Sequence, residues 1–212
     1  MRELPGSDGI VAIVDDDPSV RRGLERLIRS LGWKAETFAS AQEFLARPRT
    51  DAPSCLVLDL QLPDLSGLDL QKRMAEAGLE TPIVFLTGHG NISTSVQAMK
   101  AGAIEFLTKP VEEQDLLRAI QEAVERDRRT RKQQGHLREL RERFESLTAR
   151  EQEVMRQVIS GLLNKQIAAE LKITEDTVKF HRRHIIRKMR ADSLADLVRM
   201  AENLGIRSHR RS

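Results

Sequence analysis

Short apolar segments alternate with amphipathic stretches over about the first 120 residues, and this alternation limits the folds that the chain can adopt. Segments 10–14, 55–60, 82–87 and 103–107 are apolar runs of strand length, and the half-polar segment 34–38 is typical of an edge strand. Stretches between them have helical length and periodicity. This pattern predicts a doubly wound, five-stranded parallel sheet of the α/β class. Ligands of such sheets bind at the carboxyl ends of the strands, near the point where the strand order reverses.

Polar side chains follow the ends of four of the predicted strands. Asp15 and Asp16 follow the first strand, Asp59 the third, Thr87 the fourth and Lys109 the fifth. Carboxylates that lie close together repel one another unless a cation lies among them. Oxygen ligands of this kind suit Mg²⁺, which also binds waters and phosphate oxygens. The sequence therefore predicts a magnesium and phosphate site at this edge of the sheet.

The third acid of the same run has a different predicted role. Asp17 precedes Pro18 at the start of an amphipathic stretch, which is the pattern of a helix N-cap with proline at the first helical position. We therefore expect Asp17 to cap a helix. No glycine-rich dinucleotide motif and no Walker-type loop occurs, which excludes a dinucleotide or ATP site of those types. The single cysteine, Cys55, lies in an apolar run and is expected to be a small buried hydrophobe.

The two halves of the chain carry opposite net charge. Residues 1–123 hold 13 Lys and Arg against 19 Asp and Glu, whereas residues 124–212 hold 22 against 13. A basic half indicates a polyanionic partner, most often nucleic acid. The N-terminal residues form no apolar signal core, and no stretch approaches the roughly 20 apolar residues of a membrane span. We therefore expect a cytoplasmic protein with no membrane partner.

The basic half predicts several short helices. Thr148 and Glu151 have the spacing of a capping box, and Thr174 precedes a helix over about 175–189. On that helix one face is apolar, and the opposite face carries Lys179, Phe180, Arg183, His184 and Arg187. Two short helices joined by a turn, the second with a basic outer face, are typical of a helix-turn-helix that enters the major groove. The arginine-rich stretch 126–132 is interpreted as a solvated helix face.

These motifs resemble those of a known family. "LVLDLQLPDLSG", "FLTGHG" and "FLTKP", together with the first acid pair, resemble the receiver domain of two-component response regulators. "LTAREQEVM", "NKQIAAEL" and "TVKFHRRHIIRKM" resemble the LuxR-type helix-turn-helix of the FixJ/NarL family, and the full-length similarity is to its regulators of aromatic catabolism, of the styrene-response type. The resemblance implies a flavodoxin-like receiver over 1–124, a long helical linker over 125–145 and a small all-α DNA-binding domain over 146–212.

The resemblance also implies roles for the residues at the strand ends. Asp59 would accept a phosphoryl group from a sensor histidine kinase. Asp16, Asp59 and the backbone carbonyl of Gln61 would bind Mg²⁺ directly, and Asp15 would bind it through a water. The Lys109–Pro110 peptide bond would be cis. These roles describe a phospho-acceptor, which can catalyse its own phosphorylation and dephosphorylation, and not an enzyme that acts on a separate substrate.

A switch and two interfaces follow from the same resemblance. Thr87 and Lys109 would bind phosphoryl oxygens, and Phe106 would be the switch aromatic, since the chain has no tyrosine. Val96 and Lys100 would belong to the face through which the phosphorylated protein forms a homodimer.

In the basic half, Lys179, Phe180 and Arg183 would face the bases of promoter DNA. Phe180 departs from the smaller aliphatic residue often found at this position in the family, and its alternative role is that of an exposed apolar residue covered by the linker or the receiver. The family's function adds RNA polymerase as a partner. The last helical stretch, 193–205, is expected to close the core of the small domain, and its remaining apolar surface could pair two DNA-bound copies.

One alternative belongs to another functional class. Asp15 and Asp17 after an apolar strand, with Thr87 and Lys109 later, are also similar to haloacid-dehalogenase-type phosphohydrolases, in which Asp15 would be the nucleophile. That family needs a further acidic pair at a strand end beyond the lysine, and this chain has none there. The alternative also leaves Asp59 and the basic half without a role.

Overall fold

The computed structural model describes residues 9–48, 52–88 and 92–206. The chain divides into two compact units, Met1–Arg131 and Lys132–Ser212, which we call the N-terminal and C-terminal units. The strands of the N-terminal unit are β1 (Ile10–Val14), β2 (Lys34–Phe38), β3 (Cys55–Leu58), β4 (Ile83–Thr87) and β5 (Glu105–Thr108). Its helices are α1 (Pro18–Ser30), α2 (Ala41–Leu45), α3 (Gly67–Glu76), α4 (Ile92–Lys100) and the first part of α5 (Glu113–Glu145).

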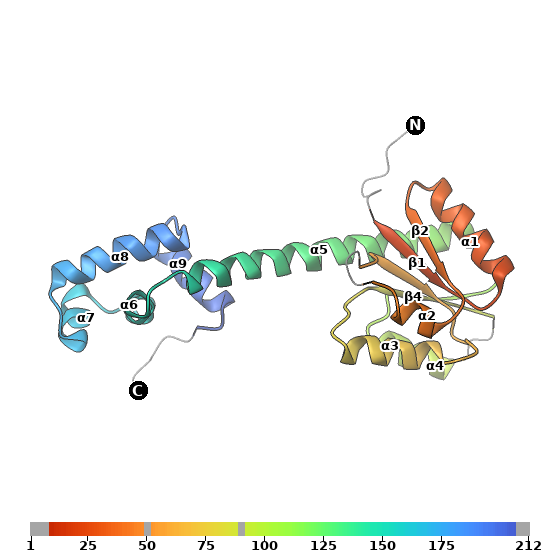
Figure 1. The fold of residues 1–212 in the computed structure, drawn as a ribbon, viewed down its shortest axis with the longest axis horizontal. Helices are drawn as coiled ribbons and strands as arrows, with labels where there is room; N and C mark the ends of the chain where they lie inside the picture. Colours follow the sequence, from red (N-terminus) through yellow and green to blue (C-terminus); the bar gives the residue numbers. More distant parts are fainter. Residues whose placement is uncertain (1–8, 49–51, 89–91, 207–212) are drawn as a thin grey trace. The chain divides into compact units, whose positions relative to one another are not determined.

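The five strands form one parallel sheet in the order β2-β1-β3-β4-β5, which confirms the predicted fold class (Figure 1). The half-polar β2 is an edge strand, as the sequence predicts. The chain passes from β1 outward to β2 and returns to β3 on the other side of β1, so the strand order reverses between β1 and β3. Val14 pairs with Leu58 across these two strands, and the residues that follow leave the sheet side by side.

Two apolar cores cover the two faces of the sheet, because alternate side chains of each strand point to opposite faces. Val11 and Ile13 pack in the core that includes residues of α1 and α5, whereas Ala12 and Val14 pack in the core that includes residues of α2, α3 and α4. Figure 1 shows α1 on one side of the sheet and α3 with α4 on the other. Cys55 is fully buried, and burial raises the pKa of its thiol, which confirms the predicted apolar role.

The predicted fifth strand starts two residues later than its apolar run. β5 begins at Glu105 and not at residue 103, although Ala103 and Ile104 are both buried. The backbone N–H of Ile104 donates to the carbonyl oxygen of Ile83 at 2.8 Å, so Ile104 already leads the chain alongside β4. Apolar character therefore begins before regular strand pairing does.

In the described part of the C-terminal unit, the regular secondary structure consists of helices joined by short turns. Helix α5 continues through Gly135 to Glu145, and α6 (Ala149–Ile159), α7 (Asn164–Leu171), α8 (Glu175–Met189) and α9 (Leu194–Asn203) follow. The capping box of Thr148 and Glu151 and the Thr174 cap are confirmed. On α9, Leu197 and Ala201 are buried in the core, whereas Leu194 is exposed.

In the part of the chain that the structure describes, no helix combines the length and the apolar character that crossing a membrane requires.

Candidate functional site

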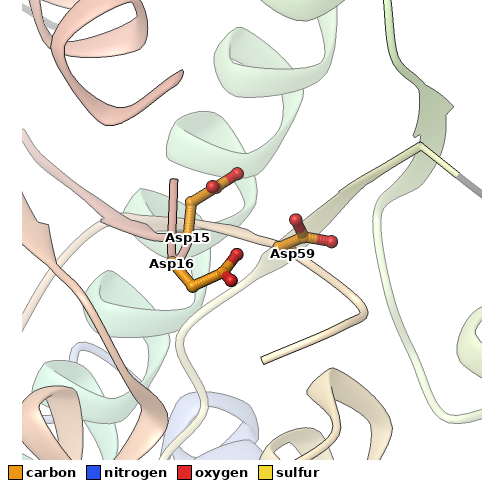
Figure 2. Close-up of side chains that lie close together, drawn as sticks. All are labelled: Asp15, Asp16 and Asp59. Carbon is orange, nitrogen blue, oxygen red and sulfur yellow. The ribbon is translucent and has the colours of Figure 1, made fainter. Parts of the chain in front are cut away.

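Three carboxylates meet where the strand order reverses (Figure 2). Asp15 and Asp16 follow β1, Asp59 follows β3, and one carboxylate oxygen from each lies within 4.8 Å of those of the other two. The pairing of Val14 with Leu58 places Asp15 and Asp59 at the same level of the sheet. Asp15 and Asp59 are 2% and 8% exposed, whereas Asp16 is exposed. The cluster therefore contains two buried carboxylates and one carboxylate that is exposed to solvent.

Lys109 joins the two buried acids. Its Nζ lies 2.6 Å from Asp15 Oδ2 and 2.6 Å from Asp59 Oδ2. Burial alone would lower the pKa of Lys109, but hydrogen bonds and charge attraction from both carboxylates outweigh it and raise this pKa. For Asp15 burial is the stronger effect and raises the pKa, although Lys109 acts in the opposite direction. The Lys109–Pro110 peptide bond is cis, as the resemblance implies.

The remaining predicted site residues lie on β4, on the loop after β3 and on β5. Thr87 ends β4 and is buried. Gln61 donates its backbone N–H to Asp59 Oδ1 at 3.1 Å, so the loop after β3 folds back onto the acid. Phe106, on β5, is partly buried, and its ring centroid lies 6.0 Å from that of Phe85 on the paired strand.

Asp17 is an N-cap and not part of the acid cluster. Its Oδ1 accepts the backbone N–H of Ser19 at 2.7 Å, and Pro18 occupies the first helical position of α1. The hydrogen bonds from the Ser19 hydroxyl and backbone lower the pKa of Asp17. The predicted cap is therefore confirmed.

Two residues that hold the site's loops were not found from the sequence. Arg21 donates from one guanidinium nitrogen to the backbone oxygens of Asp15 and Asp16, at 2.6 and 2.9 Å. Asp64 accepts the backbone N–H of Gln42 at 2.8 Å and that of Ala41 at 3.3 Å, so it caps α2 from the loop after β3. Arg21 lies one helical turn after the Asp17 cap, and this spacing could have predicted its contact with the loop after β1. The contact of Asp64 joins segments that are distant in the sequence, so no local pattern predicts it.

Helix α4 presents an apolar stripe outward. Ile92, Val96 and Met99 lie at helical spacing and are exposed, and Lys100 is exposed beside them. Ala98 is fully buried on the inner side of the helix. Both residues predicted for a dimer face therefore lie on an accessible surface.

Helix α8 has the two faces that the sequence predicts. Val178, Ile185 and Met189 are buried in the core of the C-terminal unit. The outward face carries the three predicted DNA contacts, Lys179, Phe180 and Arg183, all exposed. Lys179 Nζ lies 2.9 Å from Asp176 Oδ1 in an exposed pair that solvent screens.

The buried acid Glu151 links α6 to α8. Its spacing from Thr148 predicts the capping box but not this link. Glu151 is 4% exposed, and its Oε2 lies 2.6 Å from Lys188 Nζ. Its Oε1 lies 3.8 Å from His184 Nδ1. Burial would raise the pKa of Glu151, but the hydrogen bonds from Lys188 and Thr148 outweigh it and lower this pKa. Lys188 therefore has a structural partner within its own unit.

The arginine-rich stretch of α5 is engaged in contacts along its own helix and nearby. Arg128 and Arg129 pair with Glu125. Arg131 lies 2.7 Å from Asp127 Oδ2 and also donates to the backbone oxygen of Ala52 at 2.7 Å.

The N-terminal unit has a 2-1-3-4-5 sheet whose strand ends carry an acid cluster bridged by a lysine, and this combination defines a receiver domain. The C-terminal unit is helical and presents a basic helix outward, which defines a DNA-binding domain. The family model of the response regulator receiver domain matches residues 11–121, and that of bacterial regulatory proteins of the luxR family matches residues 145–201. The chain therefore belongs to the response regulators of two-component systems that carry a LuxR-type domain, as FixJ does, and is a DNA-binding transcription regulator.

Similar proteins cover nearly the whole chain. Nodulation protein W of Bradyrhizobium diazoefficiens is 52% identical over 197 residues, which are 93% of this chain and 87% of that protein. Response regulator protein TodT of Pseudomonas putida is 45% identical over 204 residues, 96% of this chain and 90% of that protein. The solved structure of the response regulator StyR has a TM-score of 0.82 at 48% identity and covers 91% of this chain and 98% of that chain.

These findings do not favour the phosphohydrolase alternative with Asp15 as nucleophile. The two matched domains are typical of transcription regulators that are not enzymes, and they imply a kinase partner and DNA binding. Receiver domains bind Mg²⁺ at an acidic pocket, and the cluster of Asp15, Asp16 and Asp59 is such a pocket here.

Proposed function

We propose that transfer of a phosphoryl group to Asp59 controls DNA binding by the C-terminal unit. One observation carries the proposal: Asp59 alone comes from β3 to face the acid pair of β1, and Lys109 holds it there at 2.6 Å. A phosphohistidine of the cognate sensor kinase is the donor. A carboxylate oxygen of Asp59 forms a bond to phosphorus while the donor's P–N bond breaks, and the histidine nitrogen leaves with the electron pair and takes up a proton.

The donor set fits Mg²⁺, since carboxylate and carbonyl oxygens are the ligands that this ion prefers. Asp16, Asp59 and the carbonyl of Gln61 would hold the ion directly, and Asp15 would hold it through a water. An ion held there would supply neutralisation of charge on the phosphoryl oxygens.

The protein's own side chains orient the group. The Lys109 ammonium, already placed by two carboxylates, and the Thr87 hydroxyl bind the phosphoryl oxygens. Movement of Thr87 toward that group leaves space into which the Phe106 ring turns, which changes the surface near α4. The partial burial of Phe106 on the strand paired with that of Thr87 supports this coupling.

The changed surface forms a symmetric homodimer through the face that carries Val96 and Lys100. The dimer presents two copies of α8, whose Lys179, Phe180 and Arg183 face the bases of promoter DNA, where the protein contacts RNA polymerase. The cytoplasm, which holds the promoter and the kinase's catalytic part, is the place of action. We assign residues 1–124 to the receiver, 125–145 to the linker and 146–212 to the DNA-binding domain.

The test of Asp59 uses a matched pair of acids. The full-length protein is incubated with a small acyl phosphate, with and without Mg²⁺, and the added phosphoryl group is measured by intact mass. We expect Asp59→Asn to abolish the Mg²⁺-dependent gain, whereas Asp17→Asn, which alters a helix cap, keeps most of it. A stable label on Asp15 in the Asp59→Asn protein would contradict the proposal and support the phosphohydrolase.

A further inference from the structure

We infer that Phe180 recognises the C5-methyl group of a thymine in the major groove. The inference rests on the proposed DNA-binding role of α8 and adds the chemical group that one of its residues reads. Phe180 is 55% exposed, on the outward face that also carries Lys179 and Arg183. Basic and polar side chains bind phosphates, whereas apolar side chains contact the edges of bases, so a large apolar ring beside two basic side chains suits a surface that reads bases.

The ring is held in place before any DNA binds. Its centroid lies 4.2 Å from that of His184, with the two planes at 35°, and 5.8 Å from that of His181 at 72°. Nδ1 of His184 lies 3.8 Å from Glu151, which is itself buried and bonded to Lys188 at 2.6 Å. A chain of contacts thus extends from the core of the unit to the ring. An ordered side chain loses little conformational entropy on binding.

The chemistry of the base edges selects the target. In the major groove, guanine, adenine and cytosine offer hydrogen-bond acceptors or donors, and only thymine adds a methyl group. A phenyl ring offers no conventional donor or acceptor, so against the other bases it would remove water from a polar edge and give nothing in return. Against thymine it removes water from a methyl group, which is favourable. Lys179 and Arg183 can supply the hydrogen bonds to neighbouring base pairs or phosphates.

The experiment removes the methyl group alone. DNA sites are first selected from a random pool with the full-length phosphorylated protein, and each thymine of the preferred site is then replaced by deoxyuridine. We expect the loss of one methyl group in one half-site to weaken binding about fourfold, the value of one buried methylene-sized group, and its loss in both half-sites to weaken binding roughly fifteenfold. Phe180→Ala should bind the thymine and uracil sites equally. Leu163→Ala, which shortens an exposed apolar side chain just before α7, should keep the wild-type difference.

A second set of variants tests whether α8 binds DNA at all, independently of the thymine contact. Arg183→Ala and Lys179→Ala are measured on specific and random DNA across a salt series, beside a variant in which Arg128, Arg129 and Arg131 are alanine. Loss of roughly 5- to 150-fold in specific binding for Arg183→Ala supports a base contact. Intact binding in both α8 variants, with loss only in the linker variant, would overturn the DNA-binding face itself.

If the α8 variants lose binding while no thymine shows a methyl effect, or while Phe180→Ala keeps that effect, only the thymine inference fails. Unchanged affinity of Phe180→Ala for every sequence would likewise overturn it and would assign the ring to a protein contact. Far-UV circular dichroism verifies that each variant keeps its helices.

Discussion

At the scale of single residues, the proposed phosphorylation site depends on close contacts that few side chains permit. Lys109 approaches both Asp15 and Asp59 at 2.6 Å, and Gly67 lies under the backbone of the acceptor acid. A Cβ on Gly67 would lie 2.5 Å from the carbonyl oxygen of Asp59 and 3.0 Å from Cε1 of Phe85. The start of α3 can therefore reach this position only without a side chain.

We expect Gly67→Ala to lower the free energy of unfolding of the N-terminal unit by about 1–3 kcal/mol, because the added methyl group overpacks the site. It should also slow phosphorylation, since the Asp59 backbone must move. Urea unfolding followed by the fluorescence of Trp33, the chain's one tryptophan and a buried residue of this unit, measures the first effect.

Gly23→Ala is the matched control, since a Cβ at Gly23 on the outer side of α1 meets nothing within 4 Å. Replacement of a helical glycine by alanine raises stability by about 0.5–1 kcal/mol. Equal losses of stability in both variants would contradict the packing argument for Gly67.

At the scale of elements, the pair of Glu151 and Lys188 holds α6 against α8. Because the folded state lowers the pKa of Glu151 below its ordinary value of 4.5, the pair contributes its full stability above that pH. The contribution is lost as the pH falls through the lower, folded-state pKa. We expect the wild type to lose more unfolding free energy on acidification than Glu151→Gln, as measured by urea unfolding of the helices in far-UV circular dichroism.

The partner variant tests the same link at neutral pH. We expect Lys188→Met to destabilise the C-terminal unit by about 1–3 kcal/mol, because a buried carboxylate loses a hydrogen-bond donor. The cost should shrink in the Glu151→Gln background, where no charge remains to be compensated. Arg199→Met breaks an exposed pair with Asp196 and should cost under about 0.5 kcal/mol. A comparable loss from Arg199→Met would show that burial of Glu151 is not the cause.

At the scale of the whole molecule, the proposed control of DNA binding requires that phosphorylation be converted into dimerisation. We expect Val96→Asp to leave the phosphorylation rate unchanged but to keep the phosphorylated protein monomeric, since a charge would enter the apolar stripe of α4. Lys72→Asp, an acid on the exposed side of α3, should still dimerise. Sedimentation equilibrium, with and without the phosphodonor, measures both. A wild-type protein that stays monomeric when phosphorylated, while its DNA affinity rises, would rule out this route.

The sequence by itself determined the elements and their order. A strand covered on both faces, such as β1, must be apolar throughout, and caps such as Asp17 and Thr148 satisfy N–H groups within a few residues of themselves. These patterns depend on local geometry, so they can be read without the fold. The acids at the strand ends were also predictable, because the carboxyl ends of parallel strands lie at one edge of the sheet.

Only the tertiary structure decided which charges are buried and what each one contacts. Lys109 bonds to Asp15, 94 positions earlier in the chain, and Glu151 bonds to Lys188, 37 positions later. In the sequence Glu151 and Lys188 look like the many charged side chains that remain in water. The strand-end positions of Asp15 and Lys109 predict a shared site, but not the direct bond between them. Whether such a group stays solvated or becomes a buried partner depends on the packing of distant segments, because burial removes its water and makes a specific hydrogen bond necessary.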